Sequence, residues 1–189
     1  MKRYLLLYIA TMLFSVAAHA QDVSLTLNLL PLAEGTVNLG VGYALKDNLT
    51  AELSGSVRPW ARSETAVNKY WTIRPEIRYW TCQKYNGHFF GGYLTGSQFN
   101  VGGKTYPFGL FSSIEKHRFE GWTIGTGLTY GYHFLLSRNW NLEAGLGVGY
   151  NYANYKKFVC PLLCSRVESE DDSHYFGLTK LSLAIVYLF

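Results

Sequence analysis

Bulky and small side chains alternate along residues 139–152 with a period of two. Every second position is apolar or aromatic, and this set comprises Trp140, Leu142, Ala144, Leu146, Val148, Tyr150 and Tyr152. The positions between them carry Asn, Glu or Gly, including Gly145, Gly147 and Gly149. Because successive side chains of a β-strand point to opposite faces, this pattern predicts a strand with one bulky face and one small, polar face.

The same alternation recurs along the chain and predicts eight strands. The predicted strands are 22–30, 36–45, 49–57, 70–81, 88–99, 121–134, 139–152 and 175–189. The connections after the second, fourth and sixth strands are short turns, whereas long loops lie near 58–69, 100–117 and 154–173. Short turns at one end and long loops at the other predict an antiparallel meander, and outer-membrane barrels have this asymmetry.

The volume of a barrel interior indicates which face points inward. An eight-stranded barrel has an interior that side chains just fill, so the bulky faces of all the strands would overfill it. The faces rich in Gly, Ser and Thr fit inside, and the bulky faces then point outward, against lipid. The sequence therefore predicts an all-β fold, an eight-stranded antiparallel up-and-down transmembrane β-barrel without an unpaired edge in the bilayer.

Aromatic residues gather near the ends of the predicted strands, as expected for girdles at the two membrane interfaces. Trp71, Tyr79, Trp122 and Trp140 are examples. The chain ends in 187–189 (YLF), which resembles the C-terminal signature that barrel-insertion machinery reads. We therefore expect outer-membrane lipid and the insertion machinery among the partners of the chain.

Composition and the N-terminal segment agree with this location. Charged residues make up 16% of the 189 residues, well below the roughly 25% of soluble domains. Residues 1–20 combine the basic Lys2 and Arg3, an apolar run and a cleavage site at Ala18-His19-Ala20, which predicts a cleavable signal peptide. We expect residues 21–189 to form the barrel in the outer membrane of a Gram-negative bacterium, with both termini in the periplasm. Without Lys2 and Arg3, 15 basic and 13 acidic residues remain, and the resulting net charge of +2 is too small to indicate nucleic-acid binding.

Six charged residues fall on the predicted inward face: Glu52, Arg74, Glu76, Arg78, Glu143 and Lys180. Charges in a narrow lumen need partners, and three acids with three bases favour a hydrogen-bonded plug that braces the barrel. We expect Gly145, Gly147 and Gly149 to leave room for the Arg and Glu side chains of other strands. An ion path through a narrow transporter or channel is the alternative. Pro75 lies on the outward face and cannot donate to the ladder, so we expect a bulge or local irregularity there.

Two cysteines, Cys160 and Cys164, lie in the longest predicted external loop. An oxidising compartment favours a small-ring disulfide between them. Free thiols, or a metal site with His174 and the nearby acids, are the alternatives. Cys82 lies alone at the predicted periplasmic end. The sequence assigns no metal site and no cofactor.

An enzymatic function is the main alternative to a structural one, because some eight-stranded outer-membrane barrels modify lipid A. Such enzymes need a Ser or His beside an acid at the outer rim. Two predicted loops contain such residues, namely Ser112, Ser113, Glu115 and His117 in one, and Ser173 and His174 in the other. Polar residues are ordinary in surface loops, so we predict a protein that is not an enzyme and has no catalytic residue.

The predicted loop 100–117 also carries several large apolar residues: Tyr106, Phe108, Leu110, Phe111 and Ile114. That much apolar surface needs burial. The loop can fold over the barrel mouth, lie in the membrane interface or contact a partner. These five residues are therefore a candidate partner-contact site.

Several motifs together resemble a known family. They are RPEIRYW (74–80), NGHFFGGY (86–93), PFGLF (107–111), HRFEGW (117–122) and NWNLEAGLGVGY (139–150). The chain is similar to Bacteroides-type outer-membrane proteins with a domain of unknown function, whose genes often accompany fimbrillin-type fimbria clusters. The resemblance implies a small outer-membrane barrel with fimbrial subunits as candidate partners, and it implies no catalytic residue or ligand. The family's CPxC pattern is CxxxC here, which puts a shared metal role in doubt.

Overall fold

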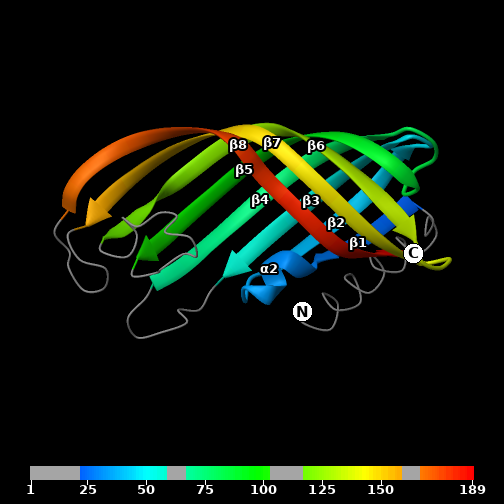
Figure 1. Ribbon diagram of the computed structural model, residues 1–189, viewed down its shortest axis with the longest axis horizontal. Helices are drawn as coiled ribbons and strands as arrows, with labels where there is room; N and C mark the ends of the chain where they lie inside the picture. The colour runs from blue at the N-terminus through cyan, green and yellow to red at the C-terminus, as the bar shows by residue number, and fades with distance from the viewer. Residues whose placement is uncertain (1–21, 59–66, 103–116, 159–166) are drawn as a thin grey trace, which may run out of the picture.

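The computed structural model describes residues 22–58, 67–102, 117–158 and 167–189, and these ranges form eight strands (Figure 1). In chain order the strands are β1 (Val23–Asn28), β2 (Val37–Lys46), β3 (Leu49–Arg58), β4 (Val67–Trp80), β5 (Gly87–Gly102), β6 (Arg118–Leu135), β7 (Trp140–Phe158) and β8 (Val167–Leu188). The short helix α2 (Leu29–Ala33) follows β1, and the Asn28 side chain caps it by accepting a hydrogen bond from the Leu30 amide. No helix in the described ranges is long and apolar enough to cross a membrane.

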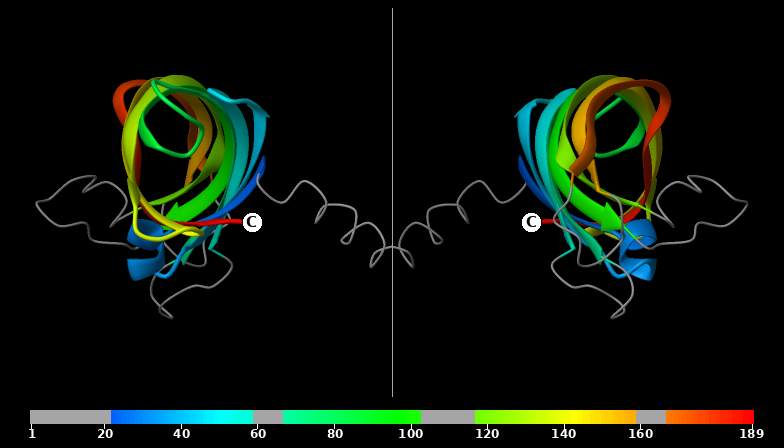
Figure 2. Two further views of the ribbon diagram at one scale, coloured as in Figure 1. Left: turned by 90° about the vertical axis from the view of Figure 1, so that its right-hand side faces the viewer. Right: turned by 90° about the vertical axis from the view of Figure 1, so that its left-hand side faces the viewer.

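The strands pair in sequence order, and every pair is antiparallel. β1 also pairs with β8, through Leu25↔Tyr187 and Leu27↔Ile185, so the sheet closes into a barrel. Figure 2 shows this ring of strands from its two ends. The prediction of an all-β chain with eight antiparallel strands in one up-and-down sheet is confirmed.

The two faces of the sheet differ as the alternation predicts. Leu128 on β6 pairs with Val148 on β7, and both side chains point outward; Leu128 is 68% exposed. Arg78 on β4 points inward and is 2% exposed. Exposed apolar side chains come from all eight strands and include Leu25, Leu39, Val41, Leu53, Ile73, Ile77, Leu94, Ile124, Leu146 and Leu181. The outside of the barrel is therefore apolar, and the buried charges lie inside.

The strands extend further than the sequence predicts at the end with the long connections. The prediction of a loop at 154–173 is wrong for most of its length, because β7 and β8 remain paired as far as Phe158↔Val167. Charged residues there are typical of a loop, yet they pair across the ladder. Lys156 Nζ, for example, lies 3.5 Å from Glu170 Oε2. Such pairs of opposite charge stabilise neighbouring strands.

The other two long connections are also shorter than predicted. β3 ends at Arg58 and β4 begins at Val67, while β5 ends at Gly102 and β6 begins at Arg118. At the other end of the chain, β1 ends at Asn28 because α2 takes the two residues that we assigned to the strand. The predicted signal peptide, residues 1–20, lies outside the described residues, as do the central parts of the three long loops.

Pro75 produces a local irregularity without a bulge. β4 pairs continuously with β3 at this point, through Leu53↔Pro75. On the other side, the β4–β5 ladder passes from Ile73↔Gly96 to Glu76↔Tyr93 in unchanged register and skips the two positions between. The missing proline N–H explains the gap. The β7–β8 ladder, in contrast, does shift its register, at the step from Gly147 to Val148.

Candidate functional site

A cluster of charged side chains occupies the lumen, with Arg78 at its centre. Arg78 Nη1 lies 2.8 Å from Glu52 Oε2 and 3.0 Å from Glu143 Oε2, and Nη2 lies 3.2 Å from Glu76 Oε2. Lys180 Nζ donates to Glu76 Oε2 at 2.5 Å. All five side chains are buried. The lumen charge cluster, as we call these five residues, joins β3, β4, β7 and β8 by charge-assisted hydrogen bonds.

The strand register explains why this cluster needs its bases. Glu52 and Glu76 lie directly opposite each other on β3 and β4, where like charges repel. The guanidinium of Arg78, two residues after Glu76, donates to both carboxylates. Glu143 approaches from β7 across the lumen. A buried charge without a partner is costly, so each member depends on the others.

Three further polar side chains contact the lumen charge cluster. His133 Nε2 lies 3.0 Å from Glu143 Oε2, and Ser182 Oγ donates to Glu143 Oε1 at 3.1 Å. Thr26 Oγ1 lies 3.5 Å from Glu52 Oε2. His133 was not predicted to contact the cluster. It lies on the glycine-rich face of the segment 121–134, and that position is the signal that could have found it.

Arg74 points inward as predicted, but it does not join the cluster. Its Nε donates to Thr95 Oγ1 at 3.1 Å and its Nη2 donates to the Thr179 carbonyl at 3.3 Å. Its guanidinium also lies 5.1 Å from the centre of the Tyr93 ring. Thr179 is the extra residue of β8 at the register shift. The irregular strand therefore supplies the carbonyl that Arg74 uses in place of a carboxylate.

Aromatic side chains fill the lumen at the end with the short turns, which the sequence analysis did not anticipate. Trp80, Tyr85, Phe89 and His133 pack together there, with ring centres 4.9 Å apart for Trp80 and Phe89 and 4.8 Å apart for Trp80 and His133. Trp80 Nε1 donates to Thr50 Oγ1 at 3.0 Å. We call the four rings the aromatic cluster. Burial raises the pKa of the Tyr85 hydroxyl.

The inward glycines make room for aromatic rings and for charged side chains. A Cβ on Gly131 would lie 2.4 Å from Phe89 Cζ, and a Cβ on Gly127 would lie 2.4 Å from the Tyr93 hydroxyl. On β7, a Cβ on Gly147 would meet Lys180 and Tyr93. The expectation that Gly145, Gly147 and Gly149 leave room for Arg and Glu side chains of other strands is wrong, because Ser182, Lys180 with Tyr93, and Thr179 are near them instead. Gly40 on β2 and Gly91 on β5 do leave room for carboxylates, those of Glu52 and Glu76.

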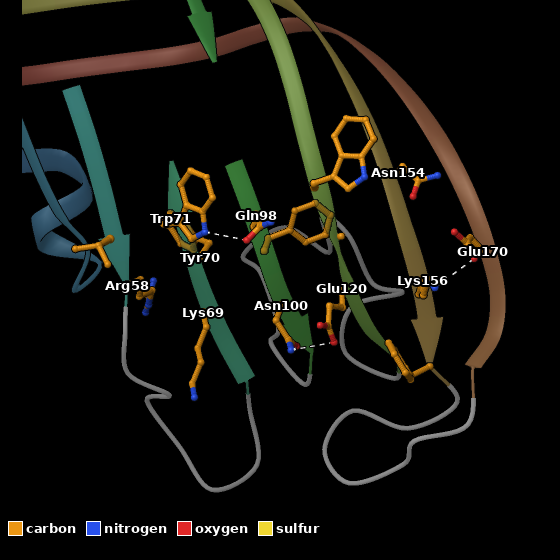
Figure 3. Close-up of a pocket in the computed structure, with 15 residues that line it drawn as sticks. Arg58, Lys69, Tyr70, Trp71, Gln98, Asn100, Glu120, Asn154, Lys156 and Glu170 are labelled. Atoms are coloured by element: carbon orange, nitrogen blue, oxygen red, sulfur yellow. Dashed lines mark hydrogen bonds and ion pairs between the residues drawn. The ribbon is translucent and has the colours of Figure 1, made fainter. Parts of the chain in front are cut away.

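A pocket of about 780 Å³ lies at the end with the long loops and takes residues from β3 to β8 (Figure 3). Two rows of outward residues line it, in register across the sheet. The first row is Val57, Trp71, Gln98, Trp122 and Asn154, and the second row is Lys69, Asn100, Glu120, Lys156 and Glu170. We call this the rim pocket. Trp71 and Trp122 were predicted as girdle residues, but the pocket itself was not predicted.

The residues considered for a lipid-modifying reaction are only partly described. Ser112, Ser113 and Glu115 lie outside the described residues. Ser173 pairs with Ala153, and His174 pairs with Tyr152. Consecutive residues of a strand point to opposite faces, so Ser173 and His174 do not face each other. His174 instead lies against Tyr150, with 2.5 Å between Nδ1 and the hydroxyl.

Several other predicted sites also fall outside the described ranges. They are the cysteines Cys160 and Cys164 and the apolar loop residues Tyr106, Phe108, Leu110, Phe111 and Ile114. Cys82 is a free, exposed thiol. Within the described ranges, no group of three or more His, Cys, Asp or Glu residues is arranged to hold a metal ion.

Comparison with known proteins places the chain in a family. No curated protein matches it. The model of one family, described as a protein of unknown function (DUF3575), matches residues 5–189. The match covers the alternating segments, the long connections and nearly all of the chain. The chain belongs to the DUF3575 family of proteins of unknown function.

Proposed function

We propose that the protein is a small, non-enzymatic β-barrel of the outer membrane of a Gram-negative bacterium. Its lumen is plugged by charges, and its long loops are displayed outside the cell for a structural, adhesive or fimbria-associated role. The observation that carries the proposal is the reversal of the usual arrangement, with apolar side chains outside the closed sheet and charges inside.

The apolar outer face supports insertion into lipid. Exposed apolar surface of this extent, contributed by every strand, is unfavourable in water and favourable in a bilayer. Closure through β1 and β8 pairs the backbone groups that an open edge would leave unsatisfied in hydrocarbon. A lipid environment therefore satisfies both the side chains and the backbone of the barrel.

The order of side chains along single strands supports a defined membrane boundary. On β4, outward residues change from Ile73 to Trp71 and then to Lys69. On β6, they change in the same direction from Ile124 to Trp122 and Glu120. Aliphatic residues, an aromatic girdle and then charged residues follow the profile of a bilayer from its core to its surface.

Tyr79 marks the opposite boundary on β4, near the short turns. The segment between Trp71 and Tyr79 has the length of a tilted transmembrane strand, which needs roughly 9–11 residues. β1 begins and β8 ends at this same end, since Ser24 pairs with Leu188. Both termini of the mature chain would then lie in the periplasm, where the insertion machinery meets the C-terminal strand.

The filled lumen supports an anchoring role in preference to transport. The lumen charge cluster crosses the interior, and the aromatic cluster fills the end with the short turns. A transported solute would have to displace buried ion pairs that depend on one another. The external loops, including the apolar segment around Phe108, are therefore the parts that we assign to partner binding, with fimbrial subunits as the candidates from the resemblance.

Two experiments test this proposal. The first separates the membranes of cells that express the chain and runs the barrel on a denaturing gel with and without boiling. We expect recovery in the outer membrane and a faster-migrating form before boiling, because a closed barrel resists detergent unfolding. Recovery in the soluble fraction would contradict the proposal.

The second experiment captures the intact barrel from outer membranes and identifies what accompanies it. We expect a fimbrial subunit that is lost when residues 103–116 are deleted, while the barrel itself still reaches the membrane. Recovery of the barrel without any partner would contradict the partner-binding role. Mass spectrometry of lipid A from a deletion strain adds a check on catalysis, and we expect an unchanged profile.

A further inference from the structure

The rim pocket contains two tryptophans in one register row. Trp71 is 42% exposed and Trp122 is 41% exposed, and both face outward. Gln98 lies between them in the ladder, and Trp71 Nε1 donates to Gln98 Oε1 at 3.0 Å (Figure 3). The Trp122 ring packs against Tyr152, with ring centres 5.7 Å apart. Neighbouring groups therefore hold both indoles in place while part of each remains accessible.

Indole faces of this kind suit one class of ligand. The face of an aromatic ring is electron-rich, and it attracts the weakly positive C–H groups on the apolar side of a sugar ring. A sugar also presents hydroxyl groups at its edge, which need hydrogen-bond donors and acceptors nearby. Gln98, Asn100 and Asn154 line the same pocket and supply amide groups for this purpose.

One of these amides has an unused acceptor. Asn100 Nδ2 donates to Glu120 Oε2 at 3.3 Å. Asn100 Oδ1 is buried but has no hydrogen-bond partner among the described residues. A buried acceptor without a donor costs free energy, and a ligand hydroxyl would satisfy it.

The charges of the rim pocket leave a positive excess. Glu120 is paired with Arg118 at 3.4 Å, and Glu170 is paired with Lys156 at 3.5 Å. In the described part of the chain, Lys69 forms no ion pair, although it lies in the same row as these acids. Both carboxylates are thus engaged while an ammonium group is free, which favours an anionic ligand.

We propose that the rim pocket binds a phosphorylated saccharide, with the sugar against Trp71 and Trp122 and the phosphate at Lys69. The position of the pocket points to the source of this ligand, because its tryptophans adjoin the apolar band and its charged row lies beyond it. The saccharide headgroup of an outer-leaflet glycolipid would lie at this level. The glycolipid as the source of the ligand rests on the proposed function, whereas the binding of a phosphorylated saccharide does not.

The test measures binding to the purified, folded chain in detergent micelles with three probes. They are N-acetylglucosamine 1-phosphate, N-acetylglucosamine and inorganic phosphate, each titrated by calorimetry. We expect the sugar phosphate to bind about tenfold more tightly than either part alone, which corresponds to about 1.4 kcal/mol. Equal binding of phosphate alone, or no binding of the sugar phosphate at about 10 mM, would overturn the proposal.

Single variants separate the two parts of the pocket. Lys69→Met should remove the preference for the sugar phosphate over the sugar, and Trp71→Ala should weaken both about tenfold. Trp140→Ala is the matched control, because Trp140 is a similarly exposed tryptophan outside this pocket, and it should bind like the wild type. A loss of binding in Trp140→Ala equal to that in Trp71→Ala would contradict the assignment.

Native mass spectrometry of the barrel purified from its own membrane identifies the source. A glycolipid that accompanies the wild type and is lost in Lys69→Met supports the headgroup. Binding of the soluble sugar phosphate without any retained glycolipid supports the same pocket with a free saccharide as ligand. The proposed function and the binding site can fail independently. A barrel that is absent from the outer membrane but still binds the sugar phosphate would contradict the proposed function and leave the binding site supported.

Discussion

Arg78 on β4 and Glu143 on β7 meet across the lumen, with 3.0 Å between Nη1 and Oε2. The two residues are 65 positions apart in the chain and lie on strands that do not pair. The same guanidinium contacts Glu52 and Glu76 on its own side of the barrel. One buried cation thus links opposite walls, which is how a narrow barrel can be braced without an apolar core.

Replacement of Arg78 by Met should destabilise the barrel strongly. The variant leaves the carboxylates of Glu52, Glu76 and Glu143 buried with Lys180 as the remaining base of the cluster. Breaking a buried ion pair costs about 3–5 kcal/mol, so we expect a loss of that size in the free energy of unfolding. Urea unfolding of the purified barrel in micelles measures it.

The control for this variant is Lys156→Ala, which removes an exposed ion pair at the end with the long loops. Pairs of this kind contribute about 0–1 kcal/mol, so the control should unfold nearly like the wild type. If both variants lose the same stability, the lumen charge cluster does not brace the barrel.

Gly131 and Gly92 form a matched pair that tests how the lumen is packed. A Cβ at position 131 would lie 2.4 Å from Phe89 Cζ and 2.9 Å from the Ala144 carbonyl oxygen. Overpacking of this kind costs about 1–3 kcal/mol, so we expect Gly131→Ala to lower the midpoint of urea unfolding. A Cβ at Gly92 meets nothing within 4 Å, so Gly92→Ala should leave the midpoint unchanged. If the two variants have the same midpoint of urea unfolding, the Phe89 ring does not occupy the space beside Gly131.

The closed lumen predicts that the wild type does not conduct ions. Purified barrel added to a planar bilayer should give no stepwise current, because the charge and aromatic clusters fill the path. Channel activity would instead appear as uniform steps that grow in number with added protein. Such steps in the wild type would support the channel alternative and refute the plug.

The alternation of side chains was enough to predict the strands and their faces, because each face follows from local sequence alone. The charged ends of β7 and β8 were not predicted, since Lys156 and Glu170 favour a strand only when they face each other across the ladder. Their polarity alone is typical of a loop. The register between two distant segments supplied the missing information.

The contents of the lumen were harder to predict. The alternation predicted an inward position for five charged residues that the structure brings together: Glu52, Glu76, Arg78, Glu143 and Lys180. Phe89 and Tyr93 were not recognised as lumen residues, because an inward ring fits only where a glycine stands on another strand. Gly131 and Gly127 stand directly opposite Phe89 and Tyr93 in the β5–β6 ladder and provide that space, so the fit depends on the register between two strands and not on any single segment.

Site-directed spin labelling in a bilayer tests the central claim most directly. Labels at Leu128→Cys and Arg138→Cys, with the native cysteines replaced by serine, report contact with oxygen in lipid or with a water-soluble nickel reagent. Leu128 lies outward in mid-strand, whereas Arg138 lies in an exposed turn. We predict that the label at 128 contacts oxygen and is shielded from nickel, while the label at 138 shows the reverse. Equal contact of both labels with the nickel reagent would mean that the apolar face of the barrel is not in a membrane.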